Sequence, residues 1–349
     1  MSDPAPGDGA SVVGGMSPDI AARDIARPGI VAPGAVPVGA APVGTAPPGG
    51  TSPGGTVWRD LRVRVLSALV LAPVGIACIL MGGPLFALLV LAGMVGIGVE
   101  WRDLLRHPPR SLRGLVFLCW PAIAAIAGLT GRWPGALLIL AASLVLGVST
   151  AIGVAATGLA GLSLLWLRFM TGSGVADVLF VLLVVWASDS FAYLAGRLIG
   201  GPKLAPSISP GKTWSGSVGG LLAGILVGGI VAGCAASPGA SLLPALGRGL
   251  AAGLLLSVVS QAGDLAESAL KRRCGVKDSG RLIPGHGGLL DRFDGLLAAA
   301  PVAALLSLWA PAGGGFWFAG ASGGLPAIHA APHWVSAHLS FLLPPEDRP

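Results

Sequence analysis

"PGALLILAASLVLGVSTAIGVAATGLAGLSLLWLRF", residues 134–169, is a nearly unbroken apolar stretch whose one charged residue is Arg168. An α-helix needs about 20 apolar residues to cross the hydrocarbon core of a bilayer. The stretch is longer than one crossing requires, and we divide it into two spans, 134–148 and 151–169. It therefore indicates a protein that lies within a membrane.

Further apolar runs lie on both sides of this stretch, and each approaches the length of a membrane span. They are 65–81, 84–99, 115–130, 175–188, 218–236, 243–262 and 296–309. Only 11% of the 349 residues are charged, and 53% are hydrophobic. Because soluble domains contain about 25% charged residues, a soluble globular protein is excluded. The sequence predicts an all-α, polytopic integral membrane bundle of about nine transmembrane helices.

The basic residues predict the orientation of this bundle, because cytoplasmic loops carry an excess of Lys and Arg. Arg59, Arg62 and Arg64 precede the first span, which places the N-terminus in the cytoplasm. Three more loops then fall inside, and they contain Arg102, Arg106, Arg110 and Arg113; Arg197, Lys203 and Lys212; and the stretch 268–295. The net charge of +6 therefore reflects topology, and we expect no nucleic-acid partner.

Three regions follow from this reading. Residues 1–57 are rich in Pro, Gly and Ala, have no helical or strand period, and are predicted to be a disordered tail. Residues 58–310 form the membrane-embedded domain, and 311–349 form a C-terminal tail.

The third inner loop, "SALKRRCGVKDSGRLIPGHGGLLDRFDG" (268–295), concentrates charge in an otherwise apolar chain. We expect glycines 280, 285, 287 and 288 to allow positive φ angles and close approach to a ligand, with backbone amides that cradle phosphate. Lys and Arg suit an anion, and the carboxylates of Asp291 and Asp294 suit Mg²⁺. The combination predicts metal-assisted phosphoryl or nucleotidyl transfer.

The residues before this loop read "QAGDLAESALKR". If the helix continues here, one face carries Asp264, Glu267, Ser268 and Lys271. Carboxylates at the end of a span are costly unless they face protein, water or a cation. An alternative is an interfacial salt bridge between Glu267 and Lys271, although it does not explain the loop that follows.

The second inner loop reads "WASDSFAYLAGRLIGGPKLAPSISPGKTWSG", residues 186–216. Asp189 and Tyr193 are i, i+4 neighbours if the preceding helix continues. The GKT at 211–213 suggests a P-loop, but Pro206 stands where its first glycine belongs, and we expect no β-strand before it. The alternatives are a basic loop that meets phosphates in another geometry and a purely structural loop.

The stretch 268–294 resembles the signature of the phosphatidate cytidylyltransferases, or CDP-diacylglycerol synthases. That signature is S-x-x-K-R, four residues, K-D-x-G, then P-x-H-G-G-x-x-D-R-x-D. The upstream "GDLAES" and the "SDSFAYLAGR…SPGKTW" loop also resemble this family, so the likeness covers roughly 62–309. One position departs from it: the family's S-P-x-K-T-x-E-G has Glu where this chain has Ser215.

The resemblance implies transfer of CMP from CTP to phosphatidic acid on the cytoplasmic side of a bacterial-type inner membrane. It implies Mg²⁺ as cofactor, with a second metal or a monovalent cation left open. The implied partners are CTP, phosphatidic acid and membrane lipid, and a homodimer is also left open. The implied catalytic residues are Asp264, Lys271, Asp291 and His286; substrate is bound by Lys212, Thr213, Arg272, Lys277, Arg292, Ser268 and Asp189; metal is bound by Asp264, Asp291, Asp294 and Asp278.

Two other functions stay open. A CTP-dependent kinase for a polyprenol or phytol would share the membrane and the nucleotide, but it would need a base for a neutral hydroxyl. A non-catalytic transporter would have its charges spread through several spans. Here the charges gather at the cytoplasmic ends of the predicted spans, which argues against transport.

Overall fold

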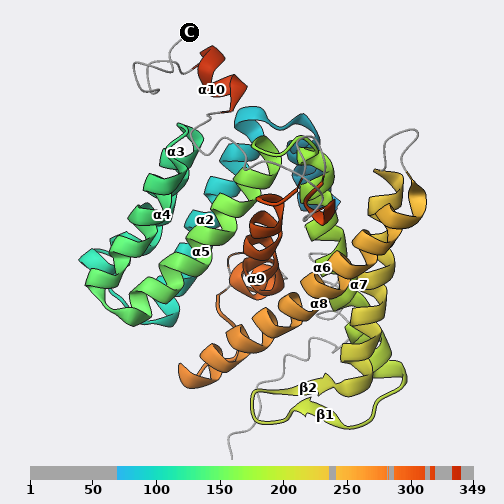
Figure 1. Ribbon diagram of the computed structural model, residues 1–349. Helices are drawn as coiled ribbons and strands as arrows, with labels where there is room; N and C mark the ends of the chain where they lie inside the picture. Colours follow the sequence, from blue (N-terminus) through green and yellow to red (C-terminus); the bar gives the residue numbers. More distant parts are fainter. Residues whose placement is uncertain are drawn as a thin grey trace, which may run out of the picture. The chain divides into compact units, whose positions relative to one another are not determined.

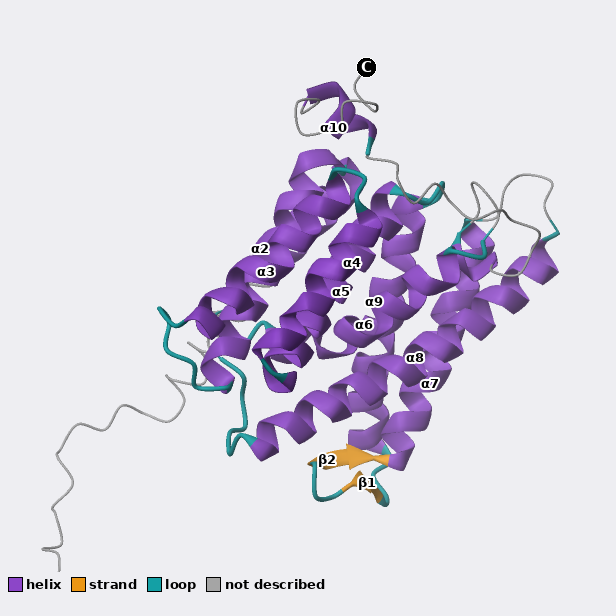
Figure 2. Cartoon of the chain, turned by 60° about the vertical axis from the view of Figure 1, so that its left-hand side comes forward, coloured by secondary structure: helices purple, strands orange, loops and turns teal. Residues whose placement is uncertain are grey.

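The structure is a computed structural model, and it describes residues 69–235, 241–280, 282, 287–310, 315–318 and 332–338. Most of these residues are helical, and the described part of the chain contains one short hairpin (Figure 2). The predicted tail 1–57 lies outside the described residues, as does His286.

A helix occupies the position of each predicted span. The described helices are Leu69–Met81, α2 (Gly83–Leu104), α3 (Leu112–Leu129), α4 (Trp133–Ala142) with the 3-10 turn η1 (Ser143–Leu146), α5 (Val148–Phe169), α6 (Gly174–Leu198), α7 (Trp214–Cys234), α8 (Leu242–Arg273), α9 (Leu290–Ser307), η2 (Phe316–Phe318) and α10 (His333–His338). Among them, α2, α3, α5, α6, α7 and α8 are long and apolar enough to cross a membrane. The all-α polytopic class is confirmed, whereas the count of nine spans stays a prediction, because Leu69–Met81 and Trp133–Leu146 are shorter.

Three helices are longer at their polar ends than the spans predicted for them. α6 continues past the predicted end at 188, α8 continues past 262, and α9 begins before 296. Hydropathy marks only the apolar part of a helix, whereas the backbone hydrogen bonds of a helix continue through polar turns. The expectation that Asp264 and Lys271 share one helix is therefore confirmed, since both lie in α8.

The loop after α6 forms an antiparallel hairpin of β1 (Lys203–Ala205) and β2 (Ser209–Thr213), in which Lys203 is opposite Thr213. The expectation of no strand at this point was wrong, because the GKT residues 211–213 form the end of β2 itself. The P-loop remains excluded by Pro206. Thr213 ends the hairpin and caps α7, since its Oγ1 accepts a hydrogen bond from the Gly216 N–H at 3.1 Å.

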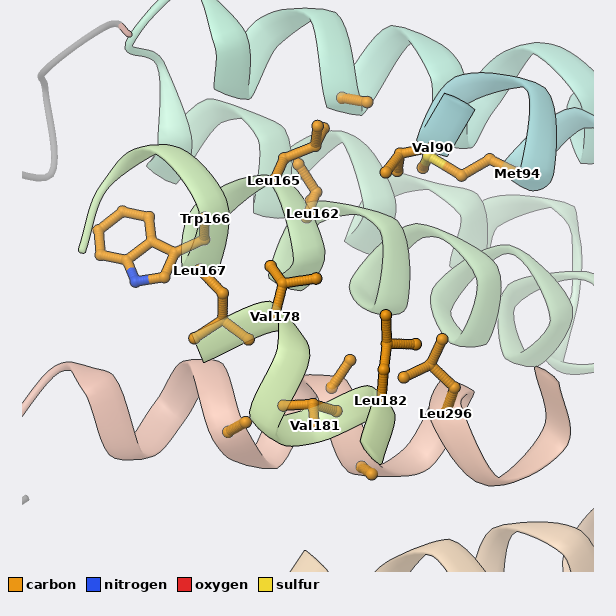
Figure 3. Packing of buried hydrophobic residues seen from close by; sticks show 14 of the residues in the cluster. Val90, Met94, Leu162, Leu165, Trp166, Leu167, Val178, Val181, Leu182 and Leu296 are labelled. Carbon is orange, nitrogen blue, oxygen red and sulfur yellow. The ribbon is translucent and has the colours of Figure 1, made fainter. Parts of the chain in front are cut away.

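α9 is surrounded by other helices, because it contacts α5, α6 and α8 (Figure 1). Figure 3 shows side chains of the buried cluster, among them Leu165 of α5, Val181 of α6 and Leu296 of α9. Burial of these groups fixes α9 against its neighbours. Its polar first turn is therefore held at a defined place at the end of the helices.

The segment assigned to the C-terminal tail contains buried residues, among them two of η2. Phe316 and Trp317 of η2 are 0% and 4% exposed. The Phe316 N–H donates to Asp177 Oδ1 of α6 at 3.1 Å, and Ser173 Oγ donates to the other carboxylate oxygen of Asp177 at 3.0 Å. Asp177 therefore ties this segment to the start of α6.

Glycines bring α7 and α8 into backbone contact. A Cβ atom built on Gly228 of α7 would lie 2.5 Å from the Gly249 carbonyl oxygen of α8. A Cβ on Gly253 would lie 2.5 Å from the Gly224 carbonyl oxygen. Small residues allow such close approach between membrane helices, where van der Waals packing stabilises association.

This packing predicts a difference between two Gly→Ala substitutions. Gly228→Ala should lower the unfolding free energy by about 1–3 kcal/mol through overpacking. Gly247→Ala in α8 should not, because a Cβ there has no neighbour within 4 Å. Both changes raise helix propensity equally, so the difference reports packing. Thermal unfolding of the two variants in the same detergent measures it, and equal midpoints would contradict the close contact of α7 with α8.

Candidate active site

Four helix ends and the hairpin meet at one end of the bundle. α6 and α8 end there, α7 and α9 begin there, and β1 and β2 lie between α6 and α7 (Figures 1 and 2). The second and third inner loops of the sequence therefore come together in space. Their predicted site residues lie on α6, β2, α8 and the first turn of α9.

An ion pair joins the hairpin to α8. Lys212 Nζ of β2 lies 2.6 Å from Asp264 Oδ2, and the two side chains are 26% and 28% exposed. Arg272 adds a second link, because its Nε donates to the Ile208 carbonyl oxygen at 3.3 Å. The hairpin is thereby fixed over α8, and Lys212 reaches the same polar region as the signature residues.

Lys271 lies between two carboxylates. Its Nζ is 2.7 Å from Glu267 Oε2 on the same helix and 2.6 Å from Asp291 Oδ1 on α9. The three side chains are only 6–13% exposed. Buried charges require partners, and this arrangement supplies them. The salt bridge between Glu267 and Lys271 considered from the sequence is present, but it belongs to a larger network that includes Asp291.

Asp291 also organises the loop before α9. It accepts hydrogen bonds from the Ser279 N–H at 3.0 and 3.2 Å and from the Gly288 N–H at 3.2 Å. Asp291 lies in the polar first turn of α9, before the apolar segment 296–309 that is predicted to cross the membrane. Burial opposes its ionisation, but the hydrogen bonds from Lys271 and Ser279 outweigh burial and hold the pKa of the Asp291 carboxyl below its usual value. Both carboxylate oxygens are thus engaged within the chain.

Glu100 was missed in the reading of the sequence. It lies near the end of α2 and is 1% exposed. Its carboxylate accepts hydrogen bonds from the Leu289 and Leu290 N–H groups at 2.8 and 2.7 Å. Ser279 Oγ donates to it at 3.0 Å. The available signal was a carboxylate directly at the end of the apolar run 84–99, because such a group needs a partner.

The glycines of the third loop have two different roles. Gly287 has a φ of +87°, as expected for a residue that needs the left-handed region. Gly280 and Gly288 are not among the described residues with positive φ, so the expectation was wrong for them. They leave room for side chains instead: a Cβ on Gly280 would lie 2.6 Å from Glu100 Oε1, and one on Gly288 would lie 2.1 Å from Ser279 Oγ. Gly285 lies outside the described residues.

Three carboxylates influence one another electrostatically. The pKa of Asp294 is raised to about 8, mainly because the side chain is buried. The negative charge of Asp264 raises it further, and the charges of other carboxylates, which include Asp189, add to this effect. A divalent cation would relieve such repulsion, and carboxylate oxygens are the ligands that Mg²⁺ prefers. The donor chemistry of Asp189, Asp264 and Asp294 therefore fits Mg²⁺. Among the described residues, no group of three His, Cys, Asp or Glu side chains is arranged to hold a metal ion.

The remaining predicted residues lie around this cluster. Ser268 Oγ is 3.5 Å from Asp264 Oδ1, which keeps it beside the ion pair with Lys212. Lys277 and Asp278 are exposed in the loop after α8, and Arg292 is exposed in the first turn of α9. Thr213 is 6% exposed and is used as a helix cap.

Ser215, the departure from the family pattern, has its own contacts. Its Oγ donates to the carbonyl oxygen of Gly200, two residues after α6, and lies 3.1 Å from Thr213 Oγ1. The hydroxyl group thus connects the end of α6 with the start of α7. The site is organised around Ser at this position.

Comparison with known proteins shows the family of this chain. The model of the cytidylyltransferase family matches residues 62–309. The phosphatidate cytidylyltransferase of Brucella abortus biovar 1 (strain 9-941) is 41% identical over 253 residues, which cover 69% of this chain and 91% of that protein. The phosphatidate cytidylyltransferase of Pseudomonas aeruginosa PAO1 is 40% identical over 281 residues, which cover 72% of this chain and 97% of that protein. The chain therefore belongs to the cytidylyltransferase family.

Proposed function

We propose that this protein transfers CMP from CTP to phosphatidic acid and forms CDP-diacylglycerol and pyrophosphate. The observation that supports this proposal most strongly is a pair of lysine–carboxylate contacts at one end of a helical membrane bundle. Lys212 contacts Asp264, and Lys271 contacts Asp291. Family membership supports the same reaction. A lipid acceptor is available at the membrane surface, where these polar helix ends are expected to lie.

The reaction places particular demands on the site. A phosphate oxygen of phosphatidic acid attacks the α-phosphorus of CTP, a new P–O bond forms, and the bond to the β-phosphate oxygen breaks to release pyrophosphate. Both reactants are anions, so the protein must position them and offset their repulsion. The ammonium groups of Lys212 and Lys271 are suited to this task. The acceptor phosphate is already ionised, so no strong base is needed.

Mg²⁺ is the cofactor that we propose for this site, and Asp264, Asp294 and Asp189 would hold it. When bound, the ion supplies positive charge to the triphosphate. The mutual repulsion of these three carboxylates supports this choice. Asp264 would have to exchange its contact with Lys212 for the ion, whereas Asp291 would have to give up hydrogen bonds from Lys271, Ser279 and Gly288. Asp278, which the sequence also suggested as a ligand, lies in the loop after α8.

A product assay tests the proposed reaction. Purified protein incubated with labelled CTP, phosphatidic acid and Mg²⁺ should yield labelled CDP-diacylglycerol together with pyrophosphate. A phosphorylated polyprenol or phytol together with CDP would instead identify a lipid kinase, and would overturn the proposal.

The metal assignment predicts different effects of three Asp→Asn substitutions. Asp264→Asn and Asp294→Asn should raise the Mg²⁺ concentration for half-maximal activity by about 10- to 100-fold, because each removes a proposed ligand. Asp291→Asn should lower kcat without that shift, because it loosens Lys271. Asp103→Asn is the control, since Asp103 is an exposed residue paired with Arg102. A Mg²⁺ shift confined to Asp291→Asn would place the metal at Asp291.

We further propose that the site faces the cytoplasm of a bacterial-type inner membrane. The helix ends and connections at the site end carry Arg102, Arg106, Arg110, Arg113, Arg197 and Lys203. The opposite end has scattered charges such as Arg132 and Arg168, and Arg168 Nε donates to the Ile79 carbonyl oxygen at 2.9 Å. This asymmetry follows the distribution of Lys and Arg in membrane proteins.

Cysteine labelling in intact cells tests this orientation. In a chain without its four natural cysteines, Ser207→Cys in the hairpin turn should be protected from an impermeant thiol reagent added outside. Ser241→Cys, at the start of α8 at the opposite end, should be labelled. Permeabilised cells provide the control, because both positions are exposed and should then react. The reverse pattern in intact cells would contradict the proposed orientation.

The contacts of Ser215 predict the effect of restoring the family residue. Ser215→Glu removes the hydrogen bond to the Gly200 carbonyl oxygen and adds a negative charge to the segment that contains Lys212. We expect KM for CTP to rise about tenfold, equivalent to about 1.4 kcal/mol. Ser215→Gln, of the same size but uncharged, separates charge from crowding and should raise KM less. A gain in kcat/KM for Ser215→Glu would refute this expectation.

A further inference from the structure

We propose that Glu100 is a positioning residue for the reaction and sets the place of Asp291 and Lys271 without touching substrate. The proposal rests on the proposed function for its kinetic consequences, whereas its structural part stands on the contacts of Glu100 alone. Glu100 lies on α2, outside the stretches of sequence that carry the signature. It is separated by 189 and 190 residues from the two backbone groups that it binds.

The surroundings of Glu100 are built for a carboxylate. The residue is 1% exposed, and both oxygens accept hydrogen bonds: Oε1 from the Leu289 N–H, and Oε2 from the Leu290 N–H and Ser279 Oγ. An unpaired carboxylate at this depth would be strongly destabilising. Three donors that converge on it therefore indicate a specific site for this side chain.

The backbone groups that Glu100 binds are the first N–H groups of α9. The first turn of a helix has N–H groups without a partner inside the helix, and a negative charge there is favoured by the helix dipole. Leu289, the N-cap residue of α9, provides no side-chain cap. Glu100 of α2 supplies the cap from another helix, and so it fixes where α9 begins.

Ser279 connects Glu100 to the catalytic cluster. Its hydroxyl group donates to Glu100 Oε2 at 3.0 Å, and its backbone N–H donates to both oxygens of Asp291. Asp291 in turn binds Lys271 at 2.6 Å. A displacement of Glu100 would therefore move the loop, the Asp291 carboxylate and the Lys271 ammonium group together.

Two glycines of the signature are explained by this carboxylate. A Cβ on Gly280 would lie 2.6 Å from Glu100 Oε1, and a Cβ on Gly288 would lie 2.9 Å from Glu100 Oε2. Distances below 3 Å are not tolerated without a shift of the neighbour. Gly280 and Gly288 therefore supply the space that the Glu100 carboxylate occupies.

α2 is itself held firmly enough to serve as a support. A Cβ on Gly98 would lie 2.2 Å from the Phe117 carbonyl oxygen of α3, so the two backbones are in contact. Trp101, the next residue after Glu100, is 5% exposed. A side chain that projects from a packed helix positions its partners better than one on a mobile loop.

Substitution of Glu100 by Gln tests the proposal at constant size. The amide keeps one acceptor oxygen and brings an NH₂ group against a backbone N–H, so the cap is broken. We expect kcat to fall about 100-fold, as a misplacement of about 1 Å can cause, while KM for CTP changes by less than about threefold. Glu100→Asp keeps the charge and should recover part of kcat. Asp103→Asn, on the same helix and exposed, is the matched control and should behave as the unmodified protein.

Hydrogen exchange gives a readout that does not depend on activity. In Glu100→Gln, the peptide that contains Leu289 and Leu290 should exchange faster, because these N–H groups lose their acceptor. Peptides from α5 should exchange at an unchanged rate, which shows that the bundle is intact. If the unmodified protein lacked transferase activity, the proposed function would fail, whereas the exchange result would still decide whether Glu100 holds this segment.

A second pair of variants keeps the test valid if Glu100→Gln does not fold. Gly280→Ala pushes a methyl group toward Glu100 and should lower kcat in the same manner. The effect of Gly280→Ala should shrink in a Glu100→Ala background, since contacting residues are not additive. Unchanged kcat and exchange in Glu100→Gln, or independent effects of Gly280→Ala and Glu100→Ala, would overturn the positioning role.

Discussion

The ammonium group of Lys271 lies between the carboxylates of Glu267 and Asp291 and joins α8 to α9 where both helices reach the polar end of the bundle. Three charged groups this deeply buried are tolerable only because each has a partner of opposite charge. The contact holds the end of α8 against the first turn of α9. Asp291 also accepts hydrogen bonds from the Ser279 and Gly288 N–H groups. The position of the loop and of the first turn of α9 depends on this arrangement.

The other side of the loop is held by Glu100. A buried carboxylate from α2 caps α9, and the absence of side chains at Gly280 and Gly288 provides the room. Residues that look like a phosphate-binding glycine loop therefore have a packing function as well. Ser279 lies between two carboxylates, Asp291 and Glu100, and donates to both. Such support places the polar groups of the site on packed helices instead of on a free loop, which suits a reaction that depends on alignment and charge.

The hairpin completes the cluster from a different part of the chain. Lys212 of β2 pairs with Asp264, and the hydroxyl groups of Thr213 and Ser215 connect the hairpin with α6 and α7. The close backbone contact of α7 with α8 carries the hairpin toward α8. Of the cationic groups suited to phosphate, Lys212 thus comes from the hairpin and Lys271 from α8, while the carboxylates come from α6, α8 and α9. This division explains why the signature residues alone are an incomplete description of the site.

The sequence by itself determined the membrane class, the position of each apolar helix and the single face of α8 that carries Asp264, Glu267 and Lys271. These features depend on hydropathy and on the 3.6-residue period, which are local properties of the chain. It also indicated the family through the signature in 268–294. Only the tertiary structure decided that Lys271 bridges to Asp291, that Lys212 reaches Asp264, and that Glu100 caps α9. The Glu100 contacts join groups 189 and 190 residues apart, and no local rule of spacing relates them. The hairpin was missed for a similar reason, because its short strands have no apolar alternation and are stabilised by their contacts with α7 and α8.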